Sequence, residues 1–234
     1  MSQLTLIDVP PPEMPEGINL HLCSVRDMVD KIDRPPALIV ADPPWHYSQA
    51  PGHSANPENH YASMRDDEIA EVLADAFHYA APASRLAVWC TWPKLQQWND
   101  AVAKLGKQWR WRYVSGGAWT KTGGSPGTGF HWLGQSELVL LYCKGQKLCT
   151  KWSKLTNAHT SQRQAHSEKP VGWQAEWLDR WTAEGDLVVD LFAGLAPMAR
   201  ACMRMDRDYA GAEIDPDRWR QAVDRLALYR PDLG

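Results

Sequence analysis

Long apolar runs are missing from this sequence. None approaches the roughly 20 residues needed to span a bilayer, and the N-terminus has no basic segment followed by an apolar core. We therefore expect no membrane segment and no signal peptide, and a cytoplasmic protein. The five cysteines are scattered and form no CxxC pair, which argues against a disulfide framework and against zinc. We expect reduced thiols and no bound metal.

Acidic residues are almost missing from residues 101–167. This stretch holds ten lysines and arginines against one acid, Glu137, for a net charge of +9. The rest of the chain holds 15 basic and 27 acidic residues, for a net charge of −12. Such a split predicts a basic face for a polyanion such as nucleic acid. The alternative is an ordinary solvated surface, whose positive charge is neutralised by acidic residues that lie nearby in the fold.

The length and composition are those of one globular domain. The 234 residues are 44% hydrophobic and 23% charged, which suits a single packed core. Prolines crowd the start of the chain, so we interpret residues 1–17 as an irregular arm. We expect residues 18–234 to form one domain, and most of the thirteen tryptophans to be packing residues.

Short apolar runs alternate with helical patterns along the chain, which is typical of an α/β fold. We predict strands over residues 18–23, 37–41, 86–91, 117–121, 137–142, 187–192 and 209–214. We predict helices over residues 68–79, 170–182, 197–205 and 217–229, the last one capped by Asp215. Three segments look like loops, namely residues 46–59, 122–128 and 144–166, and we expect the first and third to be mobile without substrate. The pattern predicts a doubly wound, mostly parallel sheet.

The strongest functional signal is the sequence Asp42-Pro43-Pro44-Trp45, directly after the apolar strand. Catalytic groups in parallel sheets lie at the carboxyl ends of strands. The amine of adenine is a poor nucleophile, because its lone pair is delocalised into the ring. A carboxylate and a backbone carbonyl can accept its two N–H bonds, and an aromatic ring can stack on an extruded base. The alternative is a proline turn in which Asp42 only caps the strand end.

Two further signals indicate a nucleotide-like cofactor. A strand ends at Asp190, a turn with Phe192 and Gly194 leads into a helix, and Glu213 ends the next strand. This arrangement allows close backbone approach at the turn and a carboxylate on ribose hydroxyls. The other signal is Lys169 at a predicted helix start, where it could bind a methionine carboxylate. Each residue has a simpler alternative. Gly194 could serve only the strand-to-helix turn, Glu213 could be a surface cap, and Lys169 could lie in water.

In this order the motifs resemble those of the DPPW-type N6-adenine methyltransferases. That family includes the catalytic subunit of the mRNA adenosine methyltransferase and bacterial and phage DNA adenine methyltransferases. The resemblance extends from about residue 19 to 219 and carries the pieces ADPPW, YASM, WTK, GFHWL, SEKP, DLFAG and GAEID. It implies a Rossmann-like methyltransferase fold with permuted motif order, in which the catalytic strand precedes the cofactor strand.

The resemblance also implies roles for individual residues. Asp42 and Pro43 would hold the target amine beside Pro44, and Trp45 would stack on the base. S-adenosylmethionine would lie against Ser24, Val25, Asp42, Lys169, Asp190, Phe192, Gly194 and Glu213. Two positions depart from the family pattern: Ser24 stands where an acid is usual, and Ala196 where a second glycine often stands.

For the nucleic acid we expect contacts from Tyr47, Lys121, His131, Trp132, Arg110 and Arg112. Period-two alternation would place the two arginines on one strand face, opposite the neighbouring rings. We interpret the protein as a DNA adenine methyltransferase, a monomer or homodimer, with an RNA adenosine methyltransferase as the alternative. A noncatalytic nucleic-acid-binding subunit is less favoured because the catalytic motif is intact. N4-cytosine methylation ranks low, since it usually comes with serine in place of Asp42.

Overall fold

The computed structural model describes residues 10–47, 63–123, 132–145, 155–162 and 168–230. Its strands are β1 (Ile18–Leu22), β2 (Leu38–Ala41), β3 (Arg85–Cys90), β4 (Arg112–Thr122), β5 (Ser136–Cys143), β6 (Ala158–Gln162), β7 (Leu187–Asp190) and β8 (Asp208–Glu213). Its α-helices are α1 (Asp66–Tyr79), α2 (Leu95–Leu105), α3 (Val171–Trp181), α4 (Pro197–Arg204) and α5 (Pro216–Leu228). Three short 3-10 helices are η2 (Asp27–Lys31), η4 (Trp92–Lys94) and η5 (Gly106–Gln108).

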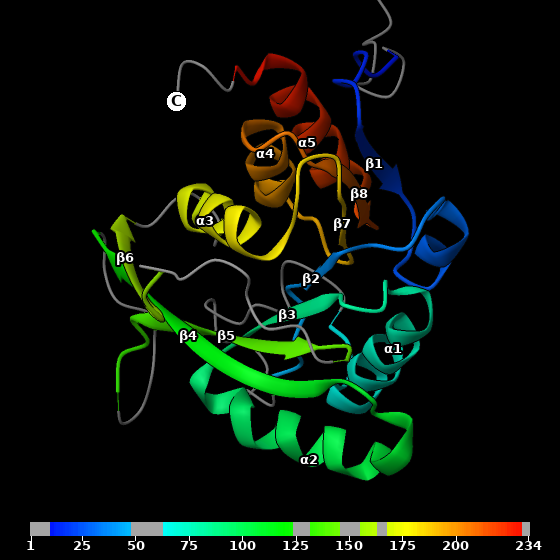
Figure 1. The fold of residues 1–234 in the computed structure, drawn as a ribbon. Helices are drawn as coiled ribbons and strands as arrows, with labels where there is room; N and C mark the ends of the chain where they lie inside the picture. Colours follow the sequence, from blue (N-terminus) through cyan, green and yellow to red (C-terminus); the bar gives the residue numbers. More distant parts are fainter. Residues whose placement is uncertain (1–9, 48–62, 124–131, 146–154, 163–167, 231–234) are drawn as a thin grey trace, which may run out of the picture.

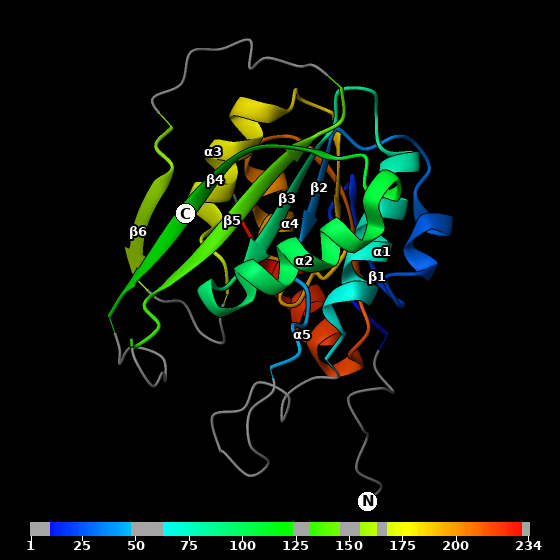
Figure 2. The ribbon, with the colours of Figure 1, turned by 90° about the horizontal axis from the view of Figure 1, so that it is seen from below.

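All eight strands form one sheet in the order β1-β8-β7-β2-β3-β5-β4-β6, and Figure 2 shows β2 to β6 side by side. The sheet is parallel except for β5, which runs antiparallel to both of its neighbours. The expected doubly wound, mostly parallel sheet is confirmed. Strand β7 comes late in the chain yet pairs with β2. The permuted motif order therefore still brings the two motif-bearing strands together.

Helices cover both faces of the sheet. Helices α3, α4 and α5 lie on one face and α1 and α2 on the other (Figure 1). The strands serve both layers because successive side chains point to opposite faces. Leu38 and Val40 of β2 pack with the α3–α5 layer, whereas Ile39 and Ala41 pack with α1 and α2. This double burial explains why β2 is entirely apolar.

The chain changes direction between β2 and β7. The connection from β2 runs through α1 on one face, and the connection from β7 runs through α4 on the other. In α/β sheets ligands bind in the crevice at the carboxyl ends of two neighbouring strands whose connections lie on opposite faces, and β2 and β7 are such a pair. The fold therefore points to the ends of β2 and β7 as the place for a site.

One α-helix and one strand were not predicted from the sequence. Helix α2 has a helical apolar pattern with Trp98 and Ala101 buried, so its signal was present. Strand β6 lies in the segment predicted as a loop, and its polar sequence AHTSQ carries no strand signal. It forms because β4 offers a free edge, and Trp119 of β4 donates a hydrogen bond to Ser161 Oγ (2.8 Å).

Several sequence predictions hold in detail. The side chain of Asp215 accepts hydrogen bonds from the first turn of α5, as its capping role requires. Most of the described tryptophans are core residues, as expected. Within the described residues, no helix is long and apolar enough to cross a membrane. Residues 48–59 and most of residues 146–166 lie outside the described part, so their expected mobility stays a prediction.

Candidate active site

Asp42 lies at the carboxyl end of β2, immediately after its last residue. The backbone carbonyls of the two prolines that follow Asp42 both accept hydrogen bonds. Trp45 N–H donates to the Pro43 carbonyl (2.8 Å), and Met64 N–H donates to the Pro44 carbonyl (2.8 Å). These bonds hold the backbone in a tight turn beside the crevice. The side chain of Asp42 stays 39% exposed, so the carboxylate can reach a ligand.

A chain of alternating charges extends from Asp42 into the protein. Lys169 Nζ donates to Asp42 Oδ2 (2.6 Å) and also pairs with Glu137 Oε2 (3.0 Å). The other oxygen of Glu137 pairs with Lys121 Nζ. Lys169 is buried and Glu137 is largely covered, with side-chain exposures of 6% and 14%. We call Asp42, Lys169, Glu137 and Lys121 the charge network. It joins the ends of β2 and β4 to the starts of β5 and α3.

The charge network sets the ionisation of its members. Desolvation raises the pKa of Asp42, Lys169 opposes the shift, and the partial exposure of the side chain moderates it. Burial would raise the pKa of Glu137 as well, but Lys169 and Lys121 together hold it below its ordinary value. Burial would lower the pKa of Lys169, yet its two carboxylate partners raise it. Lys169 is therefore cationic, and it favours the anionic form of Asp42.

Lys169 does not have the surroundings expected from the sequence. It is buried, so the solvated-lysine alternative is wrong. Its ammonium also lies between two carboxylates, which already balance its charge. A third anion, such as a methionine carboxylate, would gain little from it. The structure favours Lys169 as the partner of Asp42 instead.

Trp45 is also placed differently from the expectation. Its side chain packs edge-on against Trp98 (5.6 Å between centroids), and its indole N–H donates to the Trp89 carbonyl (3.2 Å). Only 3% of the residue is exposed. In this conformation no ring face is available for a base, so the predicted stacking role is not supported. Trp45 instead fixes the turn that presents Asp42.

The segment after Trp45 is tied to the neighbouring strand. Tyr47 and Thr91 share a hydrogen bond between their hydroxyls (2.8 Å). The ammonium of Lys94 lies over the Tyr47 ring (5.4 Å) and forms a buried ion pair with Asp66 (3.0 Å). These contacts connect the catalytic motif to the end of β3 and the start of α1. Tyr47 therefore lies beside the turn that carries Asp42, and its expected contact with nucleic acid stays a prediction.

The residues predicted for the cofactor gather at the ends of β7 and β8. Asp190 accepts from Phe192 N–H (3.3 Å), and burial raises its pKa to about 7. Glu213 accepts from Gly194 N–H (2.8 Å), and burial raises its pKa too. Strand pairing places Asp190 next to Val40 of β2. The turn therefore lies next to the catalytic motif.

The two departures from the family pattern have visible consequences. Ala196 adopts the left-handed conformation (φ 52°, ψ 50°), for which glycine is the usual residue. The alanine is fully buried there, and its N–H donates to the Ala193 carbonyl (2.8 Å). Ser24 Oγ donates to Asp27 Oδ2 (2.6 Å), so a carboxylate is supplied three residues later. Val25 is half-buried beside this turn.

The predicted nucleic-acid contacts divide between the two ends of the sheet. Lys121 ends β4 near Asp42 as part of the charge network, and Trp132 precedes β5 at the same end with 88% exposure. Arg112 opens β4 at the opposite end, where it pairs with Cys143. Arg110 lies there too, over the Phe77 ring at the end of α1 (4.8 Å). His131 lies outside the described residues.

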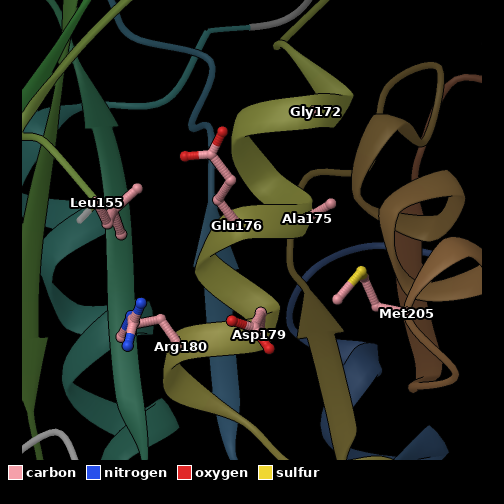
Figure 3. A pocket seen from close by; sticks show the side chains of 7 residues that line it. All are labelled: Leu155, Gly172, Ala175, Glu176, Asp179, Arg180 and Met205. Carbon is pink, nitrogen blue, oxygen red and sulfur yellow. The ribbon is translucent and has the colours of Figure 1, made fainter. Parts of the chain in front are cut away.

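The two arginines therefore do not join the candidate site. The expected alternation holds from Trp109 to Arg112, where both arginines are exposed and Trp109 and Trp111 pack in the core. It ends at Tyr113, which is exposed. A pocket on the described surface also lies elsewhere (Figure 3). It is lined by residues of α3 with Leu155 and Met205, and contains neither Asp42 nor the cofactor turn.

Sequence reasoning missed the partner role of Glu137. It stood out as the lone acid of the basic stretch, and that was the available signal, because an isolated acid among cations is placed to pair with them. Thr91 and Lys94, which hold Tyr47, carried no recognisable motif.

Comparison with known proteins agrees with this geometry. The model of the MT-A70 family matches residues 36–199, which include Asp42, the charge network and the turn after β7. The chain belongs to the MT-A70 family. No curated protein gives a significant match to the sequence. Membership confirms the resemblance inferred from the motifs. This MT-A70 protein is thus a methyltransferase that uses S-adenosylmethionine and acts on adenine in nucleic acid.

Solved structures share the fold of this MT-A70 protein at low sequence identity. M1.HpyAVI in complex with SAM is 16% identical with a TM-score of 0.64, over 89% of this chain and 99% of that chain. TTHA0409 of Thermus thermophilus, provisionally described as a DNA modification methylase, is 20% identical (TM-score 0.63; 89% and 94%). The cytosine-N4-specific PvuII DNA methyltransferase is 12% identical (TM-score 0.68; 96% and 92%).

The turn after β7 suits the polar groups of S-adenosylmethionine. A Cβ atom added at Gly194 would meet no atom within 4 Å, so the backbone faces open space into which a ligand can approach. Asp190 and Glu213 end adjacent strands, and carboxylates accept hydrogen bonds from ribose hydroxyls or an ammonium group. The residues present therefore fit the cofactor that the family uses.

Proposed function

We propose that this MT-A70 protein methylates the N6 amine of adenine in DNA, with Asp42 as the group that receives the amine. The observation that carries the proposal is the Asp42–Lys169 pair at the crevice between β2 and β7 (2.6 Å). Lys169 occupies Oδ2 of Asp42. Among the described residues none donates a hydrogen bond to Oδ1, so this oxygen is left for a ligand donor.

The proposed chemistry follows from the different partners of the two Asp42 oxygens. Oδ1 of Asp42 accepts one N–H of the amine, and the second lone pair of the Pro43 carbonyl is suited to the other. These bonds draw the nitrogen toward a pyramidal geometry and raise its electron density. Lys169 favours the anionic form of Asp42, and the anion stabilises the positive charge that the nitrogen gains in the transition state. When bound, S-adenosylmethionine supplies an electrophilic methyl group.

We propose Asp190, Phe192, Gly194 and Glu213 as the cofactor-binding residues, with Val25 and the Ser24–Asp27 turn at its adenine end. The support is that Asp190 and Glu213 end neighbouring parallel strands, at the same end of the sheet as Asp42. We also propose that residues 18–234 act as one domain, because one sheet unites strands from β1 to β8. For its assembly we keep the proposal of a monomer or homodimer.

The choice of DNA is supported by relatives rather than by the basic stretch. M1.HpyAVI, TTHA0409 and the PvuII enzyme share the fold, and the descriptions of the latter two name DNA. The basic residues support it less, because Lys121 is paired with Glu137 and the two arginines lie at the far end of the sheet. Since the PvuII enzyme is cytosine-N4-specific, the fold alone does not select the base. Adenine follows from Asp42 and from the family.

The test is mass spectrometry of nucleosides after incubation with matched DNA and RNA oligonucleotides, single- and double-stranded. We expect N6-methyladenine in DNA; preferential methylation of RNA, or N4-methylcytosine as the product, would contradict the proposal. Asp42→Asn should lower turnover by at least about 100-fold, the usual worth of one electrostatic catalytic group. Calorimetry should show that it retains cofactor binding. Asp100→Asn, an exposed aspartate of α2, is the matched control and should behave as wild type.

A further inference from the structure

Burial of Trp45 removes the stacking surface that the sequence predicted for the target base. Base stacking on an aromatic residue is a main source of affinity for unpaired nucleotides. Among the described residues, only Trp92 and Trp132 are exposed tryptophans, at 57% and 88%. Both lie at the end of the sheet that carries Asp42. Trp92 is the better anchored of the two.

The indole of Trp92 is held in one orientation while its ring remains exposed. Its Nε1–H donates to Ser136 Oγ (2.9 Å). It opens the 3-10 helix η4, where Pro93 restricts the backbone. Two residues later the buried Lys94 forms its ion pair with Asp66. An exposed ring that is preorganised in this way loses little entropy on binding.

Hydrogen bonds place Trp92 between two parts of the active site. The preceding residue, Thr91, binds the hydroxyl of Tyr47 in the segment after the catalytic motif. Ser136, the partner of the indole, directly precedes Glu137 of the charge network. β5 lies two strand spacings from β2, which is roughly 10 Å. Trp92 is therefore held at the start of β5, two strands away from β2 and Asp42, which suits a base next to the target rather than the target itself.

We propose that Trp92 is a stacking surface for the base that neighbours the target adenine in the substrate strand. This inference rests on the proposed function of the site. The base lies flat on the exposed indole, and the Ser136 hydrogen bond keeps the ring from rotating away. The contact selects a strand whose neighbouring base is unstacked, as in single-stranded DNA or beside an extruded adenine.

The first test compares Trp92→Ala with Trp92→Phe in steady-state methylation of a single-stranded oligonucleotide with one adenine. Trp92→Ala should raise the KM for the oligonucleotide about 5- to 100-fold, the range expected for one lost base stack. Trp92→Phe keeps an aromatic face and should stay within about threefold of wild type. The KM for S-adenosylmethionine should not change. Tyr113→Ala is the matched control, because this exposed ring lies at the opposite end of the sheet.

An abasic nucleotide beside the target adenine gives the sharper test. It should raise the KM of the wild type, and it should have little further effect on Trp92→Ala, because both changes remove the same contact. Additive effects would overturn the proposal. An unchanged KM for the oligonucleotide in Trp92→Ala would also overturn it. Sedimentation measures the oligomeric state of the variant, and a variant that differs from wild type only in that state would overturn the proposal as well.

Binding separates this inference from the proposed function. Fluorescence anisotropy with a labelled oligonucleotide measures the Trp92 contact whether or not methyl transfer occurs. Wild-type binding without methylation would refute the proposed function, and the Trp92→Ala comparison would still decide the stacking role.

Discussion

Removal of the Lys169 ammonium tests whether the charge network controls the ionisation of Asp42. In Lys169→Met the side chain keeps a similar length and loses its charge. Asp42 then keeps the desolvation that raises its pKa and loses the partner that lowers it. The pKa of Asp42 must therefore rise, and the anionic form needed for catalysis disappears at a higher pH than in the wild type.

The structure sets the size of this shift. Charge centres about 3 Å apart interact by about 1.4 kcal/mol at the dielectric constant of water and about 5.5 kcal/mol at a value of 20. Because the Asp42 side chain is 39% exposed, solvent screening favours the lower end of this range, at about 1.5–2 kcal/mol. One pKa unit corresponds to about 1.4 kcal/mol. The acidic limb of the pH–activity profile should therefore shift to higher pH by about one pH unit.

The assay is kcat/KM for methylation across pH 5 to 9, after thermal melting has shown that each variant is folded. Lys169→Arg keeps the charge and should keep the limb near its wild-type position. Lys94→Met is the matched control, since it breaks another buried ion pair, with Asp66. Both methionine variants should lose about 3 kcal/mol of unfolding free energy, but only Lys169→Met should move the limb. An acidic limb that stays in place in folded Lys169→Met would refute the reasoning.

Two further outcomes follow from burial. Trp45→Ala should lower the unfolding free energy by about 3–5 kcal/mol in urea denaturation, because a buried tryptophan leaves a large cavity; a loss below about 1 kcal/mol would show that the ring is not a core residue. Asp190 has its pKa raised to about 7 in the folded state, against about 3.9 when unfolded, so its ionisation costs stability progressively as pH rises from about 4 to 7. Asp190→Asn should therefore be stabilised relative to wild type at pH 8, by as much as about 4 kcal/mol, and the difference should vanish near pH 4. Urea midpoints of both proteins measured across this range check the sign, and a gap independent of pH would contradict it.

The order of strands and helices could be predicted because its signals are local. Apolar runs such as LIVA in β2 are buried on both faces, and turn residues mark where they end. Asp42, Gly194 and Glu213 follow or end such strands. Because parallel strands have their carboxyl ends on the same side of a sheet, the sequence predicted that these residues lie at one end. Strand β6 could not be predicted, since its residues form a strand only because the edge of β4 is free.

The amino-acid sequence alone determined the family, the fold class and the carboxylate proposed for catalysis, because motif spacing and hydrophobic periodicity are properties of the chain itself. The tertiary structure alone decided which side chains meet. Lys169 pairs with Asp42 across 127 residues of sequence, and Trp45 is buried by Trp98. Arg110 and Arg112 lie far from the site because β4 runs from the opposite end of the sheet. Such contacts depend on the packing of distant elements, and in a core of native density that packing decides whether a ring or a charge faces the ligand or the protein.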